Sequence, residues 1–516
     1  MTRSRWMHVR RYGTQTQSAQ ADASARKQRL VVLGTGWGGY AFLKSLSYAS
    51  LRRFDVKVIS PTTSFSFTPL LAQASCATLD FRSVVEPIHS NRWMEYHHAW
   101  CDAVDLKANR IELTSAFNPQ FRLADPLLDA NPASKDESNK DESKRVTYSL
   151  QYDYLVIGVG SYNATFGTKG VKENALFLKD VSDARAIRWR ILGLFESANA
   201  KQRQYTHQGQ VAISAEQEHQ LRRLLSFVVV GGGPTGSEFA AELHDLINDE
   251  LSRLYPNVCA YATVRLLDAG STILSSFDAR LAEYAINKFA RDGIQVQLNA
   301  KIRRVERDAV VLDSAGGHQE RIAAGMVIWS TGITTSPLIQ AFRGVAKQDR
   351  TGKLLTNHTL NLVIHPSHPN PGANVLNPAA DDSHMGSPSQ PPTPLDNVFA
   401  LGDCSASPDA LPATAQVASQ QGTYLAHLFN SHLASASPSS RSSQPKPFVF
   451  HDKGSMASIG SRSALIDSPV KKDSGTLAWL LWRSAYTIMA MSWRNRFLVP
   501  ANWASNLLFG RDVGRF

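Results

Sequence analysis

The chain has 516 residues, of which 43% are hydrophobic and 19% are charged, as in ordinary globular proteins. This length predicts two or three domains with enough apolar material for their cores. The net charge of +11 lies at the chain ends: residues 1–30 carry +6, residues 471–516 carry +5, and the residues between them sum to zero. A nucleic-acid-binding protein is expected to carry its excess charge on its body, so this distribution argues against a nucleic acid partner.

The first 29 residues have the composition of a mitochondrial transit peptide. They are rich in Arg, Ser and Gln, contain Asp22 as their single acidic residue, and lack an apolar run long enough for a secretory signal. We therefore predict that residues 1–29 are a targeting segment that is cleaved after Arg11 or Tyr12. A basic tail without a targeting role is the alternative.

The four cysteines, Cys76, Cys101, Cys259 and Cys404, are scattered without a C-x-x-C pair. This spacing argues against a disulfide scaffold, a zinc ribbon and an iron–sulfur cluster. We predict no metal site. The closely spaced redox pair that flavin disulfide reductases need after their first glycine motif is also absent from the sequence.

The first predicted α/β unit begins at residue 30. An apolar run leads into Gly34-Thr-Gly36-Trp-Gly38-Gly39, and a helix over 41–50 and a strand over 54–60 follow. Glycines between a strand and a helix allow a tight turn, a close approach of the backbone to a pyrophosphate, and close helix–strand packing. The helix N-terminus then faces the phosphate charge. The strand ends at Ser60 and not at an acidic residue, so FAD fits this site better than NAD.

A second glycine motif, Gly231-Gly232-Gly233-Pro-Thr-Gly236, follows the apolar run 227–230. A helix is predicted over 236–254 and a strand over 264–268. The strand ends in Asp268, where a carboxylate accepts hydrogen bonds from the adenosine ribose and repels a 2′-phosphate, so NADH is favoured over NADPH. A protein that holds two dinucleotides usually passes electrons between a nicotinamide and a flavin.

Three segments without an apolar period, 117–147, 366–394 and 431–447, are predicted to be solvated insertions or linkers. The Gln- and Arg-rich residues 200–222 are predicted to lead into the second unit. Buried strands are predicted at 152–160, 326–330 and 398–401, with short strands within 294–311. Gly402 and Asp403 follow the last of these strands, where a carboxylate beside a turn can reach a flavin ribityl or phosphate group.

The C-terminal region is predicted to lie on a membrane surface. Residues 477–491 are apolar but too short, and too interrupted by Arg483, to span a bilayer, which takes about 20 apolar residues. Aromatic, apolar and basic residues favour helices that lie in the membrane interface; these residues are Trp482, Tyr486, Met489, Trp493, Arg483, Arg494 and Arg496. A helix in the core or in a dimer interface is the alternative.

From residue 30 to residue 516 the sequence resembles the type II NADH:quinone oxidoreductases, the single-subunit alternative NADH dehydrogenases of mitochondria and bacteria. The resemblance rests on the two glycine motifs and on the segments 65–71, 84–88 and 400–403. Its most specific part is Ala413-Thr-Ala-Gln416-Val-Ala-Ser-Gln420, which is similar to the quinone-site signature of that family. The three insertions depart from the family pattern.

The resemblance implies an α/β fold with two Rossmann-like dinucleotide-binding domains, in which an FAD domain (30–165 and 333–447) is split by an inserted NADH domain (166–332). A C-terminal amphipathic helical membrane anchor (448–516) completes it. It also implies noncovalent FAD, NADH as the electron donor and ubiquinone as the acceptor, without proton pumping. The implied FAD-binding residues are Gly34, Gly36, Trp37, Gly38, Gly39, Thr68, Gly402 and Asp403, and the implied NADH-binding residues are Gly231, Gly233, Gly236, Glu238, Asp268 and Gly332.

Catalytic roles are implied for Glu238, between nicotinamide and flavin, and for Gln416 and Gln420 at the quinone. These glutamines lie four residues apart and share one face of a helix. An uncharged amide can hydrogen-bond a quinone carbonyl without the cost of burying a charge. Solvated helix glutamines, and simple stabilisation of a helix N-terminus by Glu238, are the alternatives.

The implied location is the mitochondrial inner membrane, with peripheral association, and a homodimer is compatible with the family. Two other flavoproteins are rival interpretations. A sulfide:quinone oxidoreductase needs reactive cysteines near its flavin, for which Cys404 beside Asp403 is the one candidate. A protein of the apoptosis-inducing-factor type would lack the quinone signature that this sequence carries.

Overall fold

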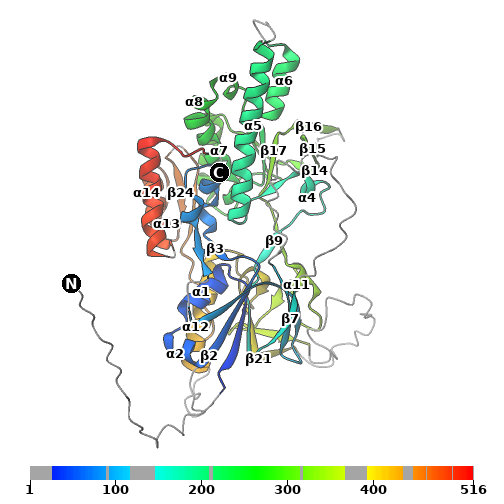
Figure 1. The fold of residues 1–516 in the computed structure, drawn as a ribbon, viewed down its shortest axis with the longest axis vertical. Coiled ribbons are helices and arrows are strands. Elements are labelled where there is room, and N and C mark those ends of the chain that lie inside the picture. Colours follow the sequence, from blue (N-terminus) through cyan, green and yellow to red (C-terminus); the bar gives the residue numbers. More distant parts are fainter. Residues whose placement is uncertain are drawn as a thin grey trace, which may run out of the picture.

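The computed structural model describes residues 26–88, 92–116, 146–207, 213–313, 318–365, 392–433, 445–460, 462–490 and 492–514. They form two α/β lobes stacked along the long axis of the molecule, with a C-terminal unit at one side (Figure 1). Most of the predicted transit peptide 1–29 and of the insertions 117–147, 366–394 and 431–447 lies outside the described residues.

The first lobe is built on an eight-stranded sheet whose central strands are parallel. Strands from both ends of the chain share this sheet, so the chain leaves the first lobe and later returns to it. The strand order is β20 (Asn361–Ile364), β21 (Thr393–Ala400), β8 (Tyr154–Ile157), β1 (Gln28–Leu33), β2 (Phe54–Ser60), β5 (Met94–Asp105), β6 (Arg110–Ser115) and β7 (Thr147–Gln151).

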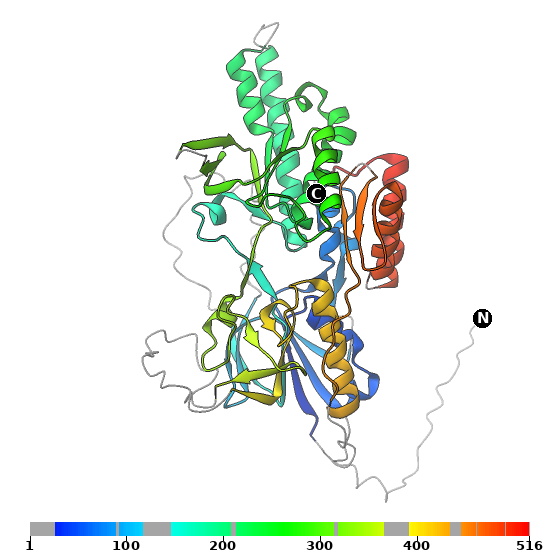
Figure 2. The same ribbon diagram turned by 180° about the vertical axis from the view of Figure 1, so that it is seen from behind.

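Strand β1 is apolar on both faces because both faces of this sheet are covered. Leu30 and Val32 belong to one core cluster, and Val31 and Leu33 belong to another. Helices α1 (Trp37–Ser45) and α12 (Ala415–Leu428) pack closely together, since a Cβ on Gly422 would lie 2.2 Å from the carbonyl oxygen of Gly38. Figure 2 shows α12 running along the first lobe.

Short elements complete the first lobe. They are α2 (Tyr48–Arg53), α11 (Pro337–Ala341), β19 (Leu354–Leu355), η6 (Gly402–Cys404), β22 (Ser405–Ala406) and the π-helix η7 (Phe429–Leu433). Segment 64–87 leaves this lobe and packs into the core of the second lobe and the C-terminal unit. It contains β3 (Ser64–Ser66), η1 (Thr68–Leu70), α3 (Leu71–Ser75), η2 (Phe81–Val84) and β4 (Val85–Pro87).

The second lobe contains a five-stranded parallel sheet with β11 at its centre. Its strands, in order, are β10 (Leu176–Phe177), β17 (Met326–Trp329), β11 (Ser226–Val230), β12 (Thr263–Leu267) and β13 (Gln295–Gln297). An antiparallel sheet lies beside it, made of β14 (Lys301–Glu306), β15 (Ala309–Asp313) and β16 (Gln319–Ala323). Its helices are α4 (Val171–Asn174), α7 (Pro234–Leu246), the π-helix η4 (Ile247–Leu251), α8 (Ser252–Leu254), α9 (Pro256–Cys259) and α10 (Ala279–Asp292).

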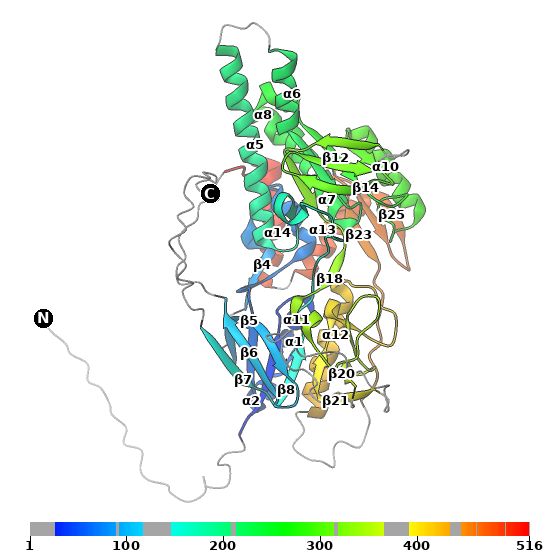
Figure 3. The same ribbon diagram turned by 90° about the vertical axis from the view of Figure 1, so that its right-hand side faces the viewer.

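Two further helices, α5 (Val181–His207) and α6 (Ala215–Leu224), project from the second lobe as a hairpin (Figure 3). The base of α5 is held by buried Ile187, Ile191 and Phe195. Residues 200–222, predicted to lead into the second unit, do precede β11 of the second lobe, and most of them are helical. Their polar composition reflects a hairpin exposed to water along much of its surface.

The chain crosses between the lobes at β9 (Ser161–Asn163) and β18 (Ile333–Thr335), which pair antiparallel. The first crossing follows β8 of the first sheet, and the second follows β17 of the second sheet. Both crossings therefore start at the carboxyl ends of parallel strands, where ligand sites of such sheets lie.

The C-terminal unit begins with an antiparallel sheet of β23 (Ser455–Ser458), β24 (Ala464–Asp467) and β25 (Lys472–Gly475). Helices α13 (Thr476–Met489) and α14 (Trp493–Phe509) follow. Trp482 and Trp503 are buried in the same core cluster as α7 and α5, so this unit is part of the folded body.

The structure moves several predicted boundaries. The predicted helix 41–50 is two helices that begin earlier, at Trp37, and break near Leu46. The predicted helix 236–254 begins at Pro234 and changes to a π-helix at Ile247. The strand predicted at 152–160 spans four residues only, because the glycines after Ile157 form the edge of a cavity.

Candidate functional site

A cavity of about 1640 Å³ is lined by both lobes and by the C-terminal unit. The predicted site residues that line it are Gly34, Gly36, Trp37, Gly38, Thr68, Glu238, Gly332, Gly402, Asp403, Gln416 and Gln420. Gly39, Gly231, Gly233, Gly236 and Asp268 are not among its lining residues. The structure therefore gathers residues far apart in the sequence into one space.

Three glycines of the first motif have different surroundings. Gly34 has φ +92°, and a Cβ there would lie 2.4 Å from the carbonyl oxygen of Gly158. A Cβ on Gly39 would lie 2.0 Å from the carbonyl oxygen of Gly34, so Gly39 is needed for helix–strand packing. A Cβ on Gly36 would meet no protein atom within 4 Å. Gly36 begins α1 without a side-chain cap, so its open side can receive a phosphate at the helix N-terminus.

The second motif repeats this pattern. Gly231 has φ +107°, and a Cβ on Gly236 would lie 1.9 Å from the carbonyl oxygen of Gly231. Gly233 begins α7, and a Cβ there would again meet no protein atom within 4 Å. The first turns of both α1 and α7 lack acidic residues that would repel a phosphate.

Asp268 lies directly after β12, beside the second glycine turn. Its Oδ2 accepts a hydrogen bond from the backbone N–H of Gly232 at 2.5 Å, and its Oδ1 accepts one from Gly270 at 2.6 Å. These bonds fix the carboxylate at the edge of the glycine turn. That is the position from which an acidic side chain reaches the ribose of a bound dinucleotide.

Asp403 lies in η6, at the carboxyl end of β21. The hydroxyl of Ser161 donates to its Oδ2 at 2.9 Å. The turn itself is held by buried Gln421, whose Oε1 accepts from the N–H of Gly402 at 2.7 Å. Sequence reasoning missed Ser161 and Gln421. Gln421 lies directly after the predicted pair Gln416 and Gln420, but the sequence motif does not show that it holds the turn at Gly402.

Trp37 and Thr68 form one wall of the cavity. The indole N–H of Trp37 donates to the hydroxyl of Thr68 at 2.9 Å, and the Trp37 ring meets Phe65 edge to face at 5.1 Å. Phe67 links this group to Tyr486 of α13, with ring centroids 6.1 Å apart. The aromatic wall therefore joins the first glycine motif to the C-terminal unit.

Glu238 lies in the second turn of α7 and faces the C-terminal unit. Its Oε1 accepts a hydrogen bond from the backbone N–H of Ser458 in β23 at 3.0 Å. Burial, opposed by this hydrogen bond and reinforced by nearby Glu242, raises the pKa of Glu238 to about 8. A carboxyl group with such a pKa can hold or release a proton near neutral pH.

Glu242, one turn further along α7, links the second lobe to segment 64–87 and, through that segment, to the C-terminal helices. It accepts hydrogen bonds from Gln73 Nε2 at 3.0 Å and from Thr78 Oγ1 at 2.7 Å. Gln73 in turn accepts from the indole N–H of Trp503 at 2.9 Å. Burial raises the pKa of Glu242, while the charge of Arg511 lowers it.

Gln416 and Gln420 share one face of α12, as predicted, but their amides bind protein backbone. Gln420 donates to the carbonyl of His451 at 2.9 Å and accepts from its N–H at 3.0 Å. Gln416 donates to the carbonyl of Gly454 at 3.2 Å and accepts from the N–H of Lys453 at 2.7 Å. The spacing of the two glutamines along the helix, about one turn, is close to the length of two residues of extended chain, so both amides can reach the same segment. The pair holds segment 451–454 against the cavity.

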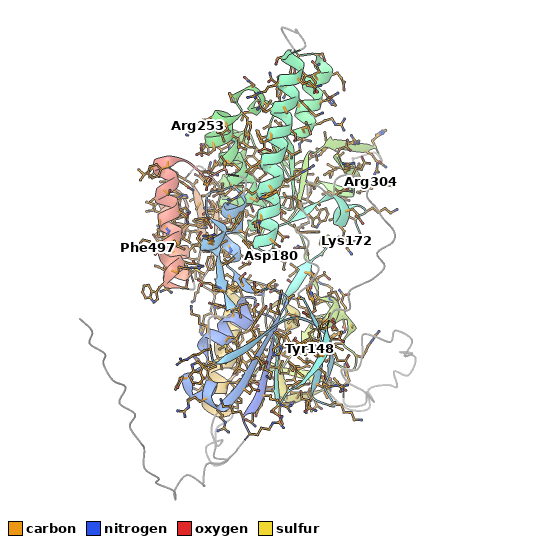
Figure 4. The ribbon with its side chains drawn as sticks, viewed as in Figure 1. Tyr148, Lys172, Asp180, Arg253, Arg304 and Phe497 are labelled. Carbon is orange, nitrogen blue, oxygen red and sulfur yellow. The ribbon has the colours of Figure 1, made fainter. Side chains whose placement is uncertain are left out.

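The C-terminal helices have a large exposed apolar face. Trp482 and Tyr486, predicted to lie in a membrane interface, are buried inside the protein instead. Phe497 points away from the body (Figure 4). The exposed apolar residues are Leu477, Leu480, Leu481, Ile488, Met489, Trp493, Phe497, Leu507, Leu508 and Phe509.

The predicted basic residues of this region make contacts within the protein. The guanidinium of Arg483 lies 3.9 Å from the centroid of the Trp479 ring and 4.6 Å from that of Trp503. Arg494 donates to the carbonyls of Arg82 and Val85, each at 2.9 Å. Within the described residues, no helix combines the length and the apolar character needed to cross a bilayer.

Residues 28–366 match the family of pyridine nucleotide-disulphide oxidoreductases, and residues 452–512 match the NDH2 C-terminal domain. A probable NADH dehydrogenase of Dictyostelium discoideum is 35% identical over 95% of this chain and 91% of that protein. The external alternative NAD(P)H-ubiquinone oxidoreductase B1, mitochondrial, of Arabidopsis thaliana is 32% identical over 94% of this chain and 91% of that protein.

The structure of NDH2 from Plasmodium falciparum in complex with NADH superposes with a TM-score of 0.76, over 95% of this chain and 100% of that chain. At 22% identity this likeness supports the fold alone. The sequence relatives cover almost the whole chain on both sides of the comparison, and the family predicted from the motifs is confirmed. The chain belongs to the alternative, or type II, NADH:ubiquinone oxidoreductases, within the pyridine nucleotide-disulphide oxidoreductase family.

Proposed function

We propose that this protein is a flavoprotein that passes two electrons from NADH through FAD to ubiquinone without pumping protons. The observation that carries this proposal is the single cavity shared by the first glycine turn, Glu238 of the second lobe, and Gln416 of α12. The relatives named as NADH dehydrogenase and NAD(P)H-ubiquinone oxidoreductase support the same reaction.

The residues of the first lobe fit FAD. The open side of Gly36 leaves room for a pyrophosphate at the start of α1, and Asp403 offers a fixed acceptor beside it in the same cavity. Trp37, Thr68 and Gly402 line the remaining wall. When bound there, FAD supplies an acceptor for the hydride of NADH and a donor of two electrons for a quinone.

The second lobe fits NADH. Gly233 leaves the start of α7 open to a phosphate, Gly231 and Gly236 allow the tight turn, and Asp268 faces the ribose position. Gly332 lies on the crossing back to the first lobe and lines the cavity. We propose that Glu238, at the cavity end of α7, orients the nicotinamide against the flavin.

We propose that Gln416 and Gln420, together with segment 451–454, form the quinone end of the cavity. Met456, Tyr486 and Met489 of the C-terminal unit also line the cavity. The exposed apolar face of that unit would place the opening at a lipid surface, where ubiquinone is dissolved.

The corresponding division of the chain is an FAD domain over 30–165 and 333–447, an NADH domain over 166–332, and a membrane-anchoring region over 448–516. The crossings at β9 and β18 support the first two boundaries. Strand β1 begins at Gln28, so the proposed targeting segment 1–29 includes two residues of the folded body. Several relatives are named as mitochondrial, which supports a peripheral location on the mitochondrial inner membrane.

A sulfide:quinone oxidoreductase is less well supported. All four cysteines are free, and Cys404, the candidate beside Asp403, is buried with a pKa raised by burial to about 11. A thiol in that state is a poor nucleophile. A nonenzymatic flavoprotein is also less well supported, because it would not need the quinone motif at 413–420.

The purified protein should carry FAD and reduce ubiquinone-1 with NADH, and it should not do so with sulfide. The measurement is the steady-state rate with each donor at equal protein concentration. Sulfide-driven turnover comparable with that of NADH would refute the assignment.

Replacing Asp268 with asparagine should narrow the preference for NADH over NADPH. The change removes the negative charge that repels a 2′-phosphate, so KM for NADPH should fall by about tenfold while FAD content stays unchanged. Steady-state kinetics with both donors measure this. Equal use of both donors by the unaltered protein would contradict the role of Asp268.

Replacing Glu238 with glutamine should change the pH dependence of stability. Because the pKa of Glu238 is raised from 4.5 to about 8 in the folded state, the folded protein binds more protons than the unfolded chain between these values. The free energy of unfolding should therefore fall as the pH rises from 4.5 to 8, by up to a few kcal/mol, and Glu238→Gln should lack this loss. The Tm of the variant, measured relative to that of the wild type, should therefore rise from pH 5 to pH 8. A constant difference would argue against a protonated Glu238.

Substituting the exposed apolar residues Trp493, Phe497 and Leu508 with serine should release the protein from membranes. These side chains are 83%, 74% and 74% exposed, so the fold should tolerate the change. Sedimentation with liposomes measures binding, and NADH oxidation with a water-soluble acceptor is the control for folding. Deletion of the whole tail would be a poorer test, because it uncovers the core around Trp482. Undiminished sedimentation of the triple variant would count against this face.

A further inference from the structure

Three polar side chains from distant parts of the chain meet at the junction of the lobes. Lys179 lies between β10 and α5, Ser161 begins the crossing strand β9, and Asp403 follows β21. The ammonium of Lys179 donates to Ser161 Oγ at 3.2 Å, and Ser161 Oγ donates to Asp403 Oδ2 at 2.9 Å. All three line the cavity, and Figure 4 labels Asp180, the neighbour of Lys179, at the junction.

The ammonium of Lys179 has hydrogens to spare. Within the part of the chain that the structure describes, its hydrogen-bond acceptor is Ser161, which uses one of three N–H groups. The two nearest carboxylates along the chain accept hydrogen bonds from other groups: Asp180 Oδ1 accepts from the backbone N–H of Ser182 at 2.8 Å, and Asp183 Oδ2 accepts from the backbone N–H of Lys179 at 2.8 Å. Both carboxylates therefore fix the start of α5. The cation remains available to a ligand in the cavity.

Two opposing effects act on the pKa of Lys179. Burial lowers its pKa, and the carboxylates of Asp403, Asp183 and Asp180 oppose this effect. Enclosing an ammonium costs free energy unless a partner compensates for the lost water. Among the described side chains, the hydrogen-bond acceptor of this ammonium is the hydroxyl of Ser161, so a ligand in the cavity that offers acceptor atoms could bind the other two N–H groups.

We propose that Lys179 is a cationic positioning residue of the flavin site, which fixes Asp403 through Ser161 and makes the bound cofactor easier to reduce. This inference rests on the proposed function. Transfer of a hydride from NADH leaves NAD⁺ and brings two electrons and one proton to the flavin, so the cofactor gains one negative charge. A fixed cation in a site that excludes water stabilises such a charge strongly.

The test compares Lys179→Met, Lys179→Arg and Ser161→Ala with the wild type, each loaded with FAD. The readout is the NADH:NAD⁺ ratio at which half of the flavin absorbance is bleached without oxygen. Lys179→Met should need a ratio about tenfold higher, which equals about 30 mV for a two-electron couple. Lys179→Arg keeps the positive charge, so its half-bleaching NADH:NAD⁺ ratio should stay within about threefold of the wild-type ratio.

Ser161→Ala separates the two parts of the role. It breaks the link to Asp403 but keeps the cation, so FAD should bind more weakly while the half-bleaching ratio stays near that of the wild type. Lys179→Gln is a second neutral variant if the methionine variant does not fold. Circular dichroism and Tm report folding for every variant.

An unchanged half-bleaching ratio in both neutral variants would overturn the proposal. A lower Tm with an unchanged half-bleaching ratio would show that Lys179 only stabilises the contact between the lobes, and this result would also overturn the proposal. Failure of the proposed function is distinguishable: in that case the wild type itself would hold no FAD, or NADH would not bleach its flavin.

Discussion

Replacing Gly36 with valine is expected to give a folded protein that no longer retains FAD. A Cβ at this position meets no protein atom within 4 Å, and the backbone at Gly36 is extended, with φ −70° and ψ −168°, which valine readily adopts. The added side chain fills the space at the start of α1 where a pyrophosphate would bind. FAD occupancy after purification should fall by at least about tenfold, which corresponds to 1.4 kcal/mol of binding free energy.

Two matched variants separate loss of the ligand from loss of the fold. Gly233→Val makes the same change in the second lobe, so it should keep FAD and lose NADH binding. Gly39→Val should disrupt folding, because its Cβ would lie 2.0 Å from a backbone oxygen. Visible absorbance measures FAD content and circular dichroism measures folding. Stoichiometric FAD in Gly36→Val would show that the first site is misassigned.

Replacing both Gln416 and Gln420 with leucine is expected to impair quinone reduction and to spare the reaction with NADH. Leucine cannot pair with the backbone of segment 451–454, so the quinone end of the cavity loses four hydrogen bonds and its fixed wall. Steady-state ubiquinone reduction should fall by about tenfold or more, because the wall that positions the quinone is no longer fixed. Bleaching of the flavin by NADH in a single turnover should stay near normal.

Ser419→Ala is the matched control for this pair. Ser419 lies between the two glutamines on α12, but among the described residues it makes no hydrogen bond to segment 451–454, so its substitution should leave that wall in place and quinone turnover nearly unchanged. Unaltered quinone turnover in the double leucine variant would refute the assignment. A parallel slowing of flavin bleaching would instead place this helix at the nicotinamide end.

The parts of the fold set by local sequence could be predicted well. The strand at 54–60 and the glycine turns follow from hydrophobic pattern and from backbone needs that only glycine meets. The position of Asp268 after β12 follows from the same local pattern. These features depend on residues close together in the chain, so one sequence suffices to find them.

The parts set by long-range packing could not be predicted. Ser458, the hydrogen-bond partner of Glu238, lies 220 residues from it in the sequence. The backbone partners of Gln416 and Gln420 belong to a segment without any motif. Lys179 carries no local signal, because its role depends on the meeting of β9, β21 and the start of α5.

The same limit explains the errors in the C-terminal region. Trp482 and Tyr486 have the composition of a membrane interface, but they are buried against α7 and the aromatic wall of the cavity. Composition identifies an amphipathic helix, whereas the direction of its faces depends on what the folded body offers for packing. The residues that do face outward, such as Trp493 and Phe497, carry the exposed apolar surface.

The most direct test of electron transfer through one cavity is a pair of half-reactions on the purified, FAD-loaded protein. Without oxygen, NADH should bleach the flavin absorbance in a single fast phase, and ubiquinone-1 added next should restore it in full. Bleaching by NADH without recovery on addition of ubiquinone-1 would contradict the account, as would a flavin that NADH leaves oxidised.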